Sequence, residues 1–172
     1  MLTIGISFCF KEVTLNNGIK ITLRIIDTTG QEKYMGLSKS YIKNCDAALF
    51  VFSLNNIESF ENIRKWMKLF DENSSKNKYV KYLVGNNNSL DRIVDDFLIK
   101  NFVKETNLKY KSVDPFVNDG IDDLFQDVAE SIFENYINKL DKEEKFKLLR
   151  EFRSKSLMYL KIPNIYFKYI NY

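Results

Sequence analysis

The chain has 172 residues, 45% of them hydrophobic and 28% charged, which is enough for one globular domain with its core and little more. It has no histidine and only two cysteines, Cys9 and Cys45, which argues against a disulfide framework, a zinc site and a nucleophile–histidine pair. Both thiols are expected to be buried. No run approaches the roughly 18 apolar residues that cross a bilayer, and no secretory signal is recognisable, so a soluble, cytoplasmic protein is expected.

The net charge of +3 is unevenly distributed along the chain. Residues 1–138 carry 17 basic and 19 acidic side chains, whereas residues 139–172 carry nine basic and four acidic ones. A body so close to neutrality offers no basic face to nucleic acid, and nucleic-acid binding is not expected. We expect a globular domain over residues 1–140 and a basic extension over residues 141–172.

The first half of the chain predicts a hairpin followed by strands and a helix. Apolar residues alternate with smaller or polar ones on both sides of Asn16-Asn17-Gly18, which indicates an antiparallel hairpin. The continuously apolar run at residues 47–52 indicates a strand that is covered on both faces, and residues 79–84 indicate another such strand. Between them, apolar residues recur at helical spacing from Ile57 to Phe70.

The second half continues the alternation of helices and strands. A helical pattern spans residues 93–105, with four side chains expected to point inward: Phe97, Leu98, Phe102 and Val103. A short strand near residues 108–113 and a helix over residues 120–140 follow. Strand–helix–strand order implies right-handed parallel crossovers. The predicted fold class is α/β, a three-layer sandwich around a mostly parallel sheet with a hairpin edge.

Four segments form a set of motifs in a fixed order. They are Thr3-Ile4-Gly5-Ile6-Ser7-Phe8, Asp27-Thr28-Thr29-Gly30-Gln31-Glu32-Lys33-Tyr34, Ser40-Tyr41 and Glu58-Ser59-Phe60-Glu61-Asn62-Ile63-Arg64-Lys65-Trp66. In order and spacing they resemble the Rab branch of the Ras-like small GTPases. The resemblance runs from Thr3 to about Leu140 and lacks the family's first strand, phosphate loop and first helix. It implies a small-GTPase-like (P-loop NTPase) fold, binding of GTP or GDP with Mg²⁺, GTP hydrolysis and regulation of vesicle traffic.

The resemblance also implies roles for individual residues. Thr3 and Asp27 would hold the magnesium ion, while Gly30 would offer its amide to the terminal phosphate. Gln31 would be the catalytic residue that orients the attacking water. From the residues alone, the alternative for segment 27–32 is a strand-ending turn, which would explain Asp27 and Gly30 but not Gln31, so the switch geometry is favoured. Thr3 can likewise be the first residue of an edge strand.

The phosphate-binding loop itself does not occur in this sequence. None of the six glycines is followed by lysine, so the G-x-x-x-x-G-K-[ST] pattern is missing. Losing several charge-assisted hydrogen bonds of roughly 1.5–3 kcal/mol each weakens binding by on the order of 5–10 kcal/mol. Tight GTP binding by this chain alone is therefore not expected, and whether it is an enzyme stays open.

The motif that reads guanine is altered as well. The family carries Asn-Lys-x-Asp after its fifth strand; here Asn86 keeps the first place, while Asn87 and Ser89 replace the lysine and the aspartate. A carboxylate accepts hydrogen bonds from two guanine N–H groups at once, whereas a serine hydroxyl offers at best a single, weaker contact. Asp91 could substitute only in a shifted loop, and the alternative for this run is a polar turn. Of the later Ser-Ala-Lys contact, Ser112 remains and the lysine has become an acid.

The surface for partner proteins is better preserved. Rab effectors and regulators read the hairpin and the second switch through exposed apolar side chains, and the resemblance places the usual aromatic triad at Phe8, Ile26 and Tyr41. Apolar residues at sheet positions are also typical of the core, so both interpretations stay open.

The extension departs from the family. No cysteine follows Cys45, so no prenyl anchor is expected. Residues 142–160, including Phe146, pattern as a basic amphipathic helix, for which packing against the domain is favoured over peripheral contact with an anionic endomembrane. Pro163 stops the helix, and residues 165–170 have strong strand propensity. We hypothesise that this tail covers or fills the position of the missing first strand, whose neighbours would otherwise be left without backbone partners.

Three functional interpretations follow. The first is a truncated Rab-like small GTPase with impaired nucleotide binding. The second is a nucleotide-independent interaction module that keeps the switch surface. The third is an incomplete gene model of an active Rab, because Met1 stands immediately before a motif that lies inside the family's domain. Nucleotide affinity separates the first two.

Overall fold

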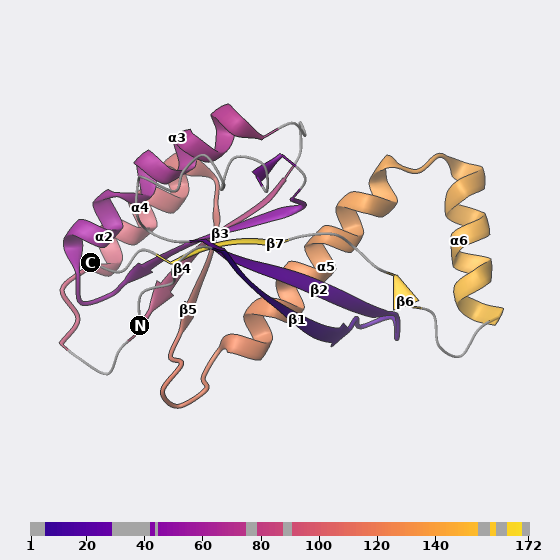
Figure 1. The fold of residues 1–172 in the computed structure, drawn as a ribbon, viewed down its shortest axis with the longest axis horizontal. Helices are drawn as coiled ribbons and strands as arrows, with labels where there is room; N and C mark the ends of the chain where they lie inside the picture. Colours follow the sequence, from indigo (N-terminus) through magenta and orange to yellow (C-terminus); the bar gives the residue numbers. More distant parts are fainter. Residues whose placement is uncertain are drawn as a thin grey trace.

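A central β-sheet organises the fold (Figure 1). The computed structural model describes residues 6–28, 42–43, 45–74, 79–87, 91–154, 159–160 and 165–169. In these residues the sheet has the order β1-β2-β7-β3-β4-β5, and β6 pairs with β2 beside β7. The strands are β1 Ile6–Thr14, β2 Lys20–Thr28, β3 Ala47–Ser53, β4 Val80–Asn86, β5 Lys109–Val113, β6 Tyr159–Leu160 and β7 Ile165–Tyr169. The helices are α2 Ile57–Glu61, α3 Ile63–Asn73, α4 Asp96–Thr106, α5 Ile121–Lys139 and α6 Lys142–Ser154.

The predicted hairpin is confirmed, and its strands are longer than expected. β1 and β2 pair antiparallel from Ile6↔Thr28 to Thr14↔Lys20. At the turn, the amide of Gly18 donates to the carbonyl of Leu15 at 2.8 Å, and the Asn17 side chain accepts from the amide of Ile19. Gly18 has φ +85°, a conformation that glycine adopts without steric cost. The Asn-Asn-Gly sequence thus fixes the register of the hairpin.

The tail fills the centre of the sheet, as hypothesised. β7 lies parallel to β2, pairing Ile165–Phe167 with Ile25–Asp27, and parallel to β3, pairing Ile165–Tyr169 with Ala47–Val51. Because β3–β4 and β4–β5 are also parallel, β7 completes a run of parallel strands from β2 to β5. The strand at this position comes from the carboxyl-terminal part of the chain.

Two hydrophobic clusters lie on the two faces of the sheet, which confirms the three-layer α/β sandwich. α5 covers one face, and its buried Val128 and Ile132 join Ile21, Leu49 and Tyr82 from the strands. Helices α2, α3 and α4 cover the other face (Figure 1). The core of that layer includes Phe50, Phe52, Phe60, Trp66, Phe70 and Phe102.

Several helical predictions need correction. The single helix expected from Ile57 to Phe70 is divided into α2 and α3 at Asn62, whose amide donates to the carbonyl of Glu58 and closes α2. In α4, Phe97 and Leu98 are exposed rather than inward. The helix begins after Asp95, whose side chain accepts from the amide of Phe97, and its buried stripe comes from Ile99 and Phe102 instead.

The expected burial of Cys9 and of Phe146 is wrong, and so is the expected length of the last helix. Cys9, on the edge strand β1, is exposed rather than buried, whereas Cys45 is buried as predicted. α6 is shorter than the expected helix over residues 142–160, since Tyr159–Leu160 forms β6. Phe146 on α6 does not pack against the domain and is 72% exposed. Within the described part of the chain, no helix has the length and apolar character that crossing a membrane requires.

A proline in β7 tests its central position. Phe167→Pro removes an amide from a strand with neighbours on both sides and is expected to lower the free energy of unfolding by at least about 1–3 kcal/mol, because a buried carbonyl loses its donor. Lys142→Pro is the control, because it places proline at the first position of α6, where helices tolerate it. Chemical denaturation followed by circular dichroism measures both variants. Equal stability of the two would contradict the central placement of β7.

Candidate functional site

The carboxyl ends of the parallel strands bring together two of the predicted nucleotide-binding residues. Asn86 ends β4 and pairs with Ser53 of β3 on one side and Val113 of β5 on the other. Ser112 precedes Val113 and pairs with Gly85. The two residues predicted to contact guanine therefore lie on adjacent strands at one end of the sheet, where open α/β sheets bind their ligands.

Backbone hydrogen bonds hold the start of the altered guanine loop. The carbonyl of Asn86 accepts from the amide of Leu54 at 2.9 Å, and the amide of Asn87 donates to the carbonyl of Val113 at 2.8 Å. Asn86 is 5% exposed. Gly85 before it is closely approached by two side chains: an added Cβ would lie 2.7 Å from the Tyr110 hydroxyl and 3.1 Å from Leu54 Cδ2, so the Tyr110 side chain would have to shift. Tyr110 and Gly85 were missed by sequence reasoning because nothing in either segment indicates this contact.

The second half of this region is a tight turn between β5 and α5. Burial raises the pKa of the Tyr110 phenol, and a hydrogen bond with the Ser112 side chain opposes that shift. Asp114, which stands where the family has lysine, accepts from the amide of Phe116 at 3.0 Å and exchanges backbone hydrogen bonds with Asp119. Gly120 then starts α5 with φ +71°. The Asp114 carboxylate therefore stabilises the turn between β5 and α5 through an Asx-type hydrogen bond, which is a common role of aspartate.

The predicted magnesium and catalytic residues are only partly described. Asp27, half-buried at the carboxyl end of β2, pairs with Ser7 of β1 and Phe167 of β7. Thr3, Gly30 and Gln31 lie outside the described residues. No group of three or more metal-ligating side chains is found in the part of the chain that the structure describes. Asp27 alone does not make a magnesium site, because Mg²⁺ requires several oxygen ligands in octahedral geometry.

The described residues also do not fit the phosphates of a nucleotide. Such phosphates are held by backbone amides of a glycine-rich loop and by a lysine, and the Gly-Lys-Ser or Gly-Lys-Thr pattern of that loop does not occur in the sequence. The family's loop follows the strand at the position that β7 occupies here.

The hairpin exposes an aromatic and basic surface, which we call the hairpin face: Phe8, Phe10 and Arg24. Phe8 is 41% and Phe10 65% exposed, and the Arg24 guanidinium lies over the Phe8 ring at 4.4 Å from its centroid. Arg24 is the register partner of Phe10. Cation–π contacts of this kind stabilise exposed aromatic rings.

The predicted effector triad fits this surface only in part. Phe8 belongs to the hairpin face, but Ile26 is fully buried, so of the two interpretations left open for this residue the structure agrees with a core position. Tyr41 lies outside the described residues. Phe10 was missed, although its alternation with Phe8 along β1 could have placed both on one face.

Polar contacts with α5 fix the hairpin on its other side. The Lys11 ammonium donates to Asp122 at 2.7 Å, and the Gln126 side chain donates to the carbonyl of Thr14 at 3.0 Å. The amide of Asn16 donates to Glu130 at 2.6 Å. These contacts orient the hairpin face through α5.

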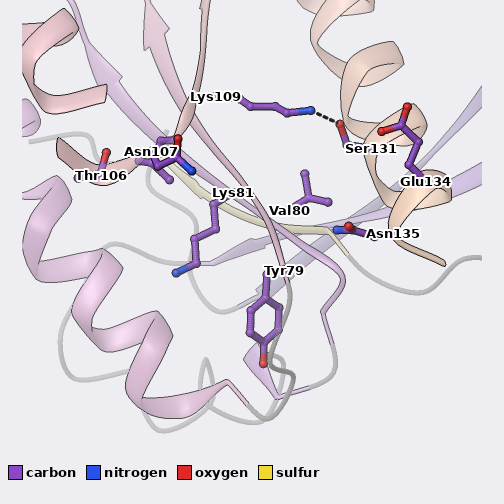
Figure 2. A pocket seen from close by; sticks show the side chains of 10 residues that line it. Tyr79, Val80, Lys81, Thr106, Asn107, Lys109, Ser131, Glu134 and Asn135 are labelled. Carbon is purple, nitrogen blue, oxygen red and sulfur yellow. Dashed lines mark hydrogen bonds between the residues drawn. The ribbon is translucent and has the colours of Figure 1, made fainter. Parts of the chain in front are cut away.

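A separate pocket of about 280 Å³ lies at the amino ends of β4 and β5. Figure 2 shows Lys109 reaching across to Ser131 on α5, with its ammonium donating at 2.8 Å. Ser131 also lies 3.1 Å from the Tyr82 hydroxyl, whose pKa is raised by burial. The pocket is at the other end of these strands from Asn86 and Ser112, so it is distinct from the candidate site.

Comparison with known proteins identifies relatives over most of the chain. Residues 1–134 match the family model described as "Ras family". The chain is 30% identical to "Ras-related protein Rab-10" of Caenorhabditis elegans over 145 residues, 83% of this chain and 71% of that protein. It is 32% identical to "GTP-binding protein ypt3" of Schizosaccharomyces pombe, over 80% of this chain and 64% of that protein. The "Probable Rab-related GTPase" of Acanthamoeba polyphaga mimivirus is 30% identical, with 79% and 64% covered. The chain thus spans about two thirds of the length of these relatives.

Gly18 and Gly120 both have positive φ. Replacing each by alanine separates the cost of backbone strain from the cost of close packing against β5. Gly18→Ala meets nothing within 4 Å and is expected to cost about 1–2 kcal/mol through its backbone conformation alone. Gly120→Ala would add a Cβ 2.7 Å from the carbonyl oxygen of Ser112, so it should cost about 1–3 kcal/mol more. Denaturant titration compares them. A Gly120→Ala variant as stable as Gly18→Ala would show that the turn does not pack against β5 as described.

Proposed function

Because the chain belongs to the Ras family of small GTPases, on its Rab-like branch, we propose that it acts in vesicle traffic as a partner-binding domain whose own guanine-nucleotide binding is weak. The observation that carries this proposal is β7 in the centre of the sheet. In the family, the strand at this position leads into the phosphate loop. Here it is a segment of the tail, Ile165–Tyr169, and no phosphate-loop pattern occurs in the sequence.

The same strand supports a fold that holds without nucleotide. β7 supplies backbone partners to both β2 and β3, so the sheet is continuous from β1 to β5 within the chain itself. A first strand that brought a phosphate loop would need this position, and two strands cannot occupy it together. Nucleotide binding of the family type and insertion of β7 are therefore mutually exclusive in this proposal.

Partner binding is assigned to the hairpin face. Phe10 supplies an exposed aromatic ring, and Phe8 with Arg24 forms a preorganised cation–π pair beside it. Aromatic and arginine side chains are the residue types that dominate binding energy at interfaces. Because the hairpin is anchored to α5 by Lys11 and Asn16, its orientation does not depend on a bound phosphate. Rab effectors or regulators are the proposed class of partner.

A second candidate function is a GTP-hydrolysing switch. It is favoured by Asn86 and Ser112, which lie side by side at the carboxyl ends of β4 and β5. In that function Asn86 and Ser112 would contact guanine, Thr3 and Asp27 would hold Mg²⁺, Gly30 would face the phosphate, and Gln31 would orient water. It requires a phosphate loop in the place of β7, so nucleotide affinity distinguishes the two candidates.

Titration with a fluorescent GDP analogue in Mg²⁺ buffer measures that affinity. We expect a dissociation constant of roughly micromolar or weaker, because the charge-assisted contacts of a phosphate loop are missing. The GTP-binding protein ypt3 of Schizosaccharomyces pombe serves as the positive control. Residual binding should fall in Asn86→Ala and not in Asn101→Ala, an exposed asparagine on α4. Sub-micromolar binding by this chain would overturn the first proposal in favour of the switch.

Partner binding is measured against a panel of purified Rab-binding domains in the absence of nucleotide. Phe10→Ala is expected to weaken binding about tenfold, the effect of removing an aromatic anchor. Phe116→Ala, which removes an even more exposed phenylalanine from the β5–α5 turn, is expected to have no effect. If no domain binds, or if both variants lose binding equally, the hairpin face is not the partner surface.

A further inference from the structure

The pocket at the amino ends of β4 and β5 is formed where two strands and two helices meet. The register pairs Tyr82 of β4 with Lys109 of β5, so these two side chains lie on the same face of the sheet. It is the face that α5 covers, because Tyr82 and Val80 belong to the cluster around that helix. α4 ends at Thr106, and the left-handed conformation of Asn107, with φ 54°, turns the chain into β5. The pocket therefore lies between the end of α4, the starts of both strands and α5.

Lys109 brings a positively charged group with spare hydrogen-bonding capacity into this pocket. Its ammonium donates to Ser131 Oγ (Figure 2) and lies 5.7 Å from the centroid of the Tyr82 ring. Ser131 is 7% exposed, so the hydroxyl that positions the ammonium is a buried group in the pocket wall. Among the residues that the structure describes, no carboxylate lies within ion-pair distance of Lys109. An ammonium has three donors, and two of these are therefore available to a ligand.

Glu134 brings a negative charge to the same pocket. It follows Ser131 by three residues on α5, so the two side chains share one face of the helix, and both line the pocket. Burial raises the pKa of the Tyr82 phenol, and the negative charges of Asp127 and Glu134 raise it further. The charge of Glu134 therefore reaches the Tyr82 hydroxyl. In the described part of the chain, no cationic side chain lies within ion-pair distance of Glu134.

The second lysine of the pocket wall does not change this balance. Lys81 stands between Val80 and Tyr82 on β4, so its side chain leaves the opposite face of the strand. Its ammonium forms an ion pair with Asp71 of α3. One cation and one anion, each without a charged partner among the described residues, therefore remain in the pocket.

Size and charge together restrict the ligand class. The volume of about 280 Å³ is at the lower end of the range of roughly 300–1,000 Å³ for ligand pockets, which fits a small metabolite. A simple anion would be attracted by Lys109 and repelled by Glu134, and a simple cation would meet the reverse. A molecule that carries both charges satisfies both side chains. The amides of Asn107 and Asn135, which also line the pocket, can donate and accept hydrogen bonds and favour a polar ligand.

We propose that this pocket binds a small polar zwitterion of the amino-acid class. The carboxylate of the ligand lies on the Lys109 ammonium, its ammonium lies on Glu134, and its polar side chain faces Asn107 and Asn135. Ser131 is a positioning residue that holds Lys109. None of these residues belongs to the hairpin face or to the candidate guanine site, so the inference goes beyond the proposed partner-binding function. Its failure would leave that function unchanged.

Titration of the full chain with L-glutamine, followed by the NMR shifts of its amides, tests the proposal. We expect saturable shifts at the pocket residues with a dissociation constant of about 1 mM or tighter, as for a ligand of this size. Two analogues each lack one charge: glutaramate has no α-ammonium, and 4-aminobutanamide has no carboxylate. Each should bind about tenfold more weakly than glutamine, because one charge-assisted hydrogen bond is lost.

Charge-neutral variants assign the two contacts. Lys109→Gln should weaken glutamine binding about tenfold and abolish the preference for glutamine over 4-aminobutanamide. Glu134→Gln should weaken it similarly and abolish the preference over glutaramate. The matched controls are Lys100→Gln on α4 and Glu143→Gln on α6, both at exposed positions. They should bind all three compounds as the unchanged chain does.

Circular dichroism of each variant shows whether it is folded, and the analogue series on the unchanged chain decides the question even if a variant is not. Absence of saturable shifts at the pocket residues would overturn the proposal. Glutaramate or 4-aminobutanamide binding as tightly as glutamine would overturn it too, since the pocket would then recognise a single charge. Equal loss of binding in the control variants would also contradict it, because binding would follow the total charge of the chain.

Discussion

The pairing of β7 between β2 and β3 is the interaction on which the rest of the structure depends. All seven residues of β3 are buried, so its backbone groups on the side facing β2 have no access to water. Buried amides and carbonyls without hydrogen bonds are costly, and native proteins pair nearly all of them. β7 provides these partners along Ala47–Val51 and provides them to Ile25–Asp27 as well. The two hydrophobic layers can then form on a continuous sheet.

The path of the chain to β7 explains the exposed position of α6. After α5 ends at Lys139, the tail must return to β6, which pairs with Lys20 and Ile21 at the start of β2. α6 spans part of this return and contributes none of its described side chains to the core clusters. The register between the tail and β2 also shifts by one residue. Four residues, 161–164, separate β6 from β7, whereas only three residues, 22–24, separate the parts of β2 with which these two strands pair. A strand at the centre and a helix at the periphery are thus consequences of one connection.

Much of the fold could be predicted from local chemistry. The apolar run at 47–52 and the Asn-Asn-Gly turn each permit one interpretation, and the position of the tail strand followed from its propensity and from the gap that the family comparison left in the sheet. The break at Asn62 could not be predicted, because the apolar stripe continues in phase from α2 into α3. The same holds for Ile26 and Phe97, whose burial depends on where neighbouring elements pack. In the candidate site, motif order placed Asn86 near Ser112, whereas the approach of Tyr110 to Gly85 exists only in the folded chain.

Hydrogen exchange of the full chain tests the central claim most directly. If β7 is a central strand, the amides of Tyr166 to Lys168 should exchange about as slowly as those of Leu49 to Val51 in β3, because both open only when the sheet unfolds. The amides of α6, which lies outside the core, should exchange much faster. Rapid exchange of Tyr166 to Lys168 while β3 stays protected would contradict the account. It would mean that the sheet is closed without β7 and that the position of the first strand is open to another occupant.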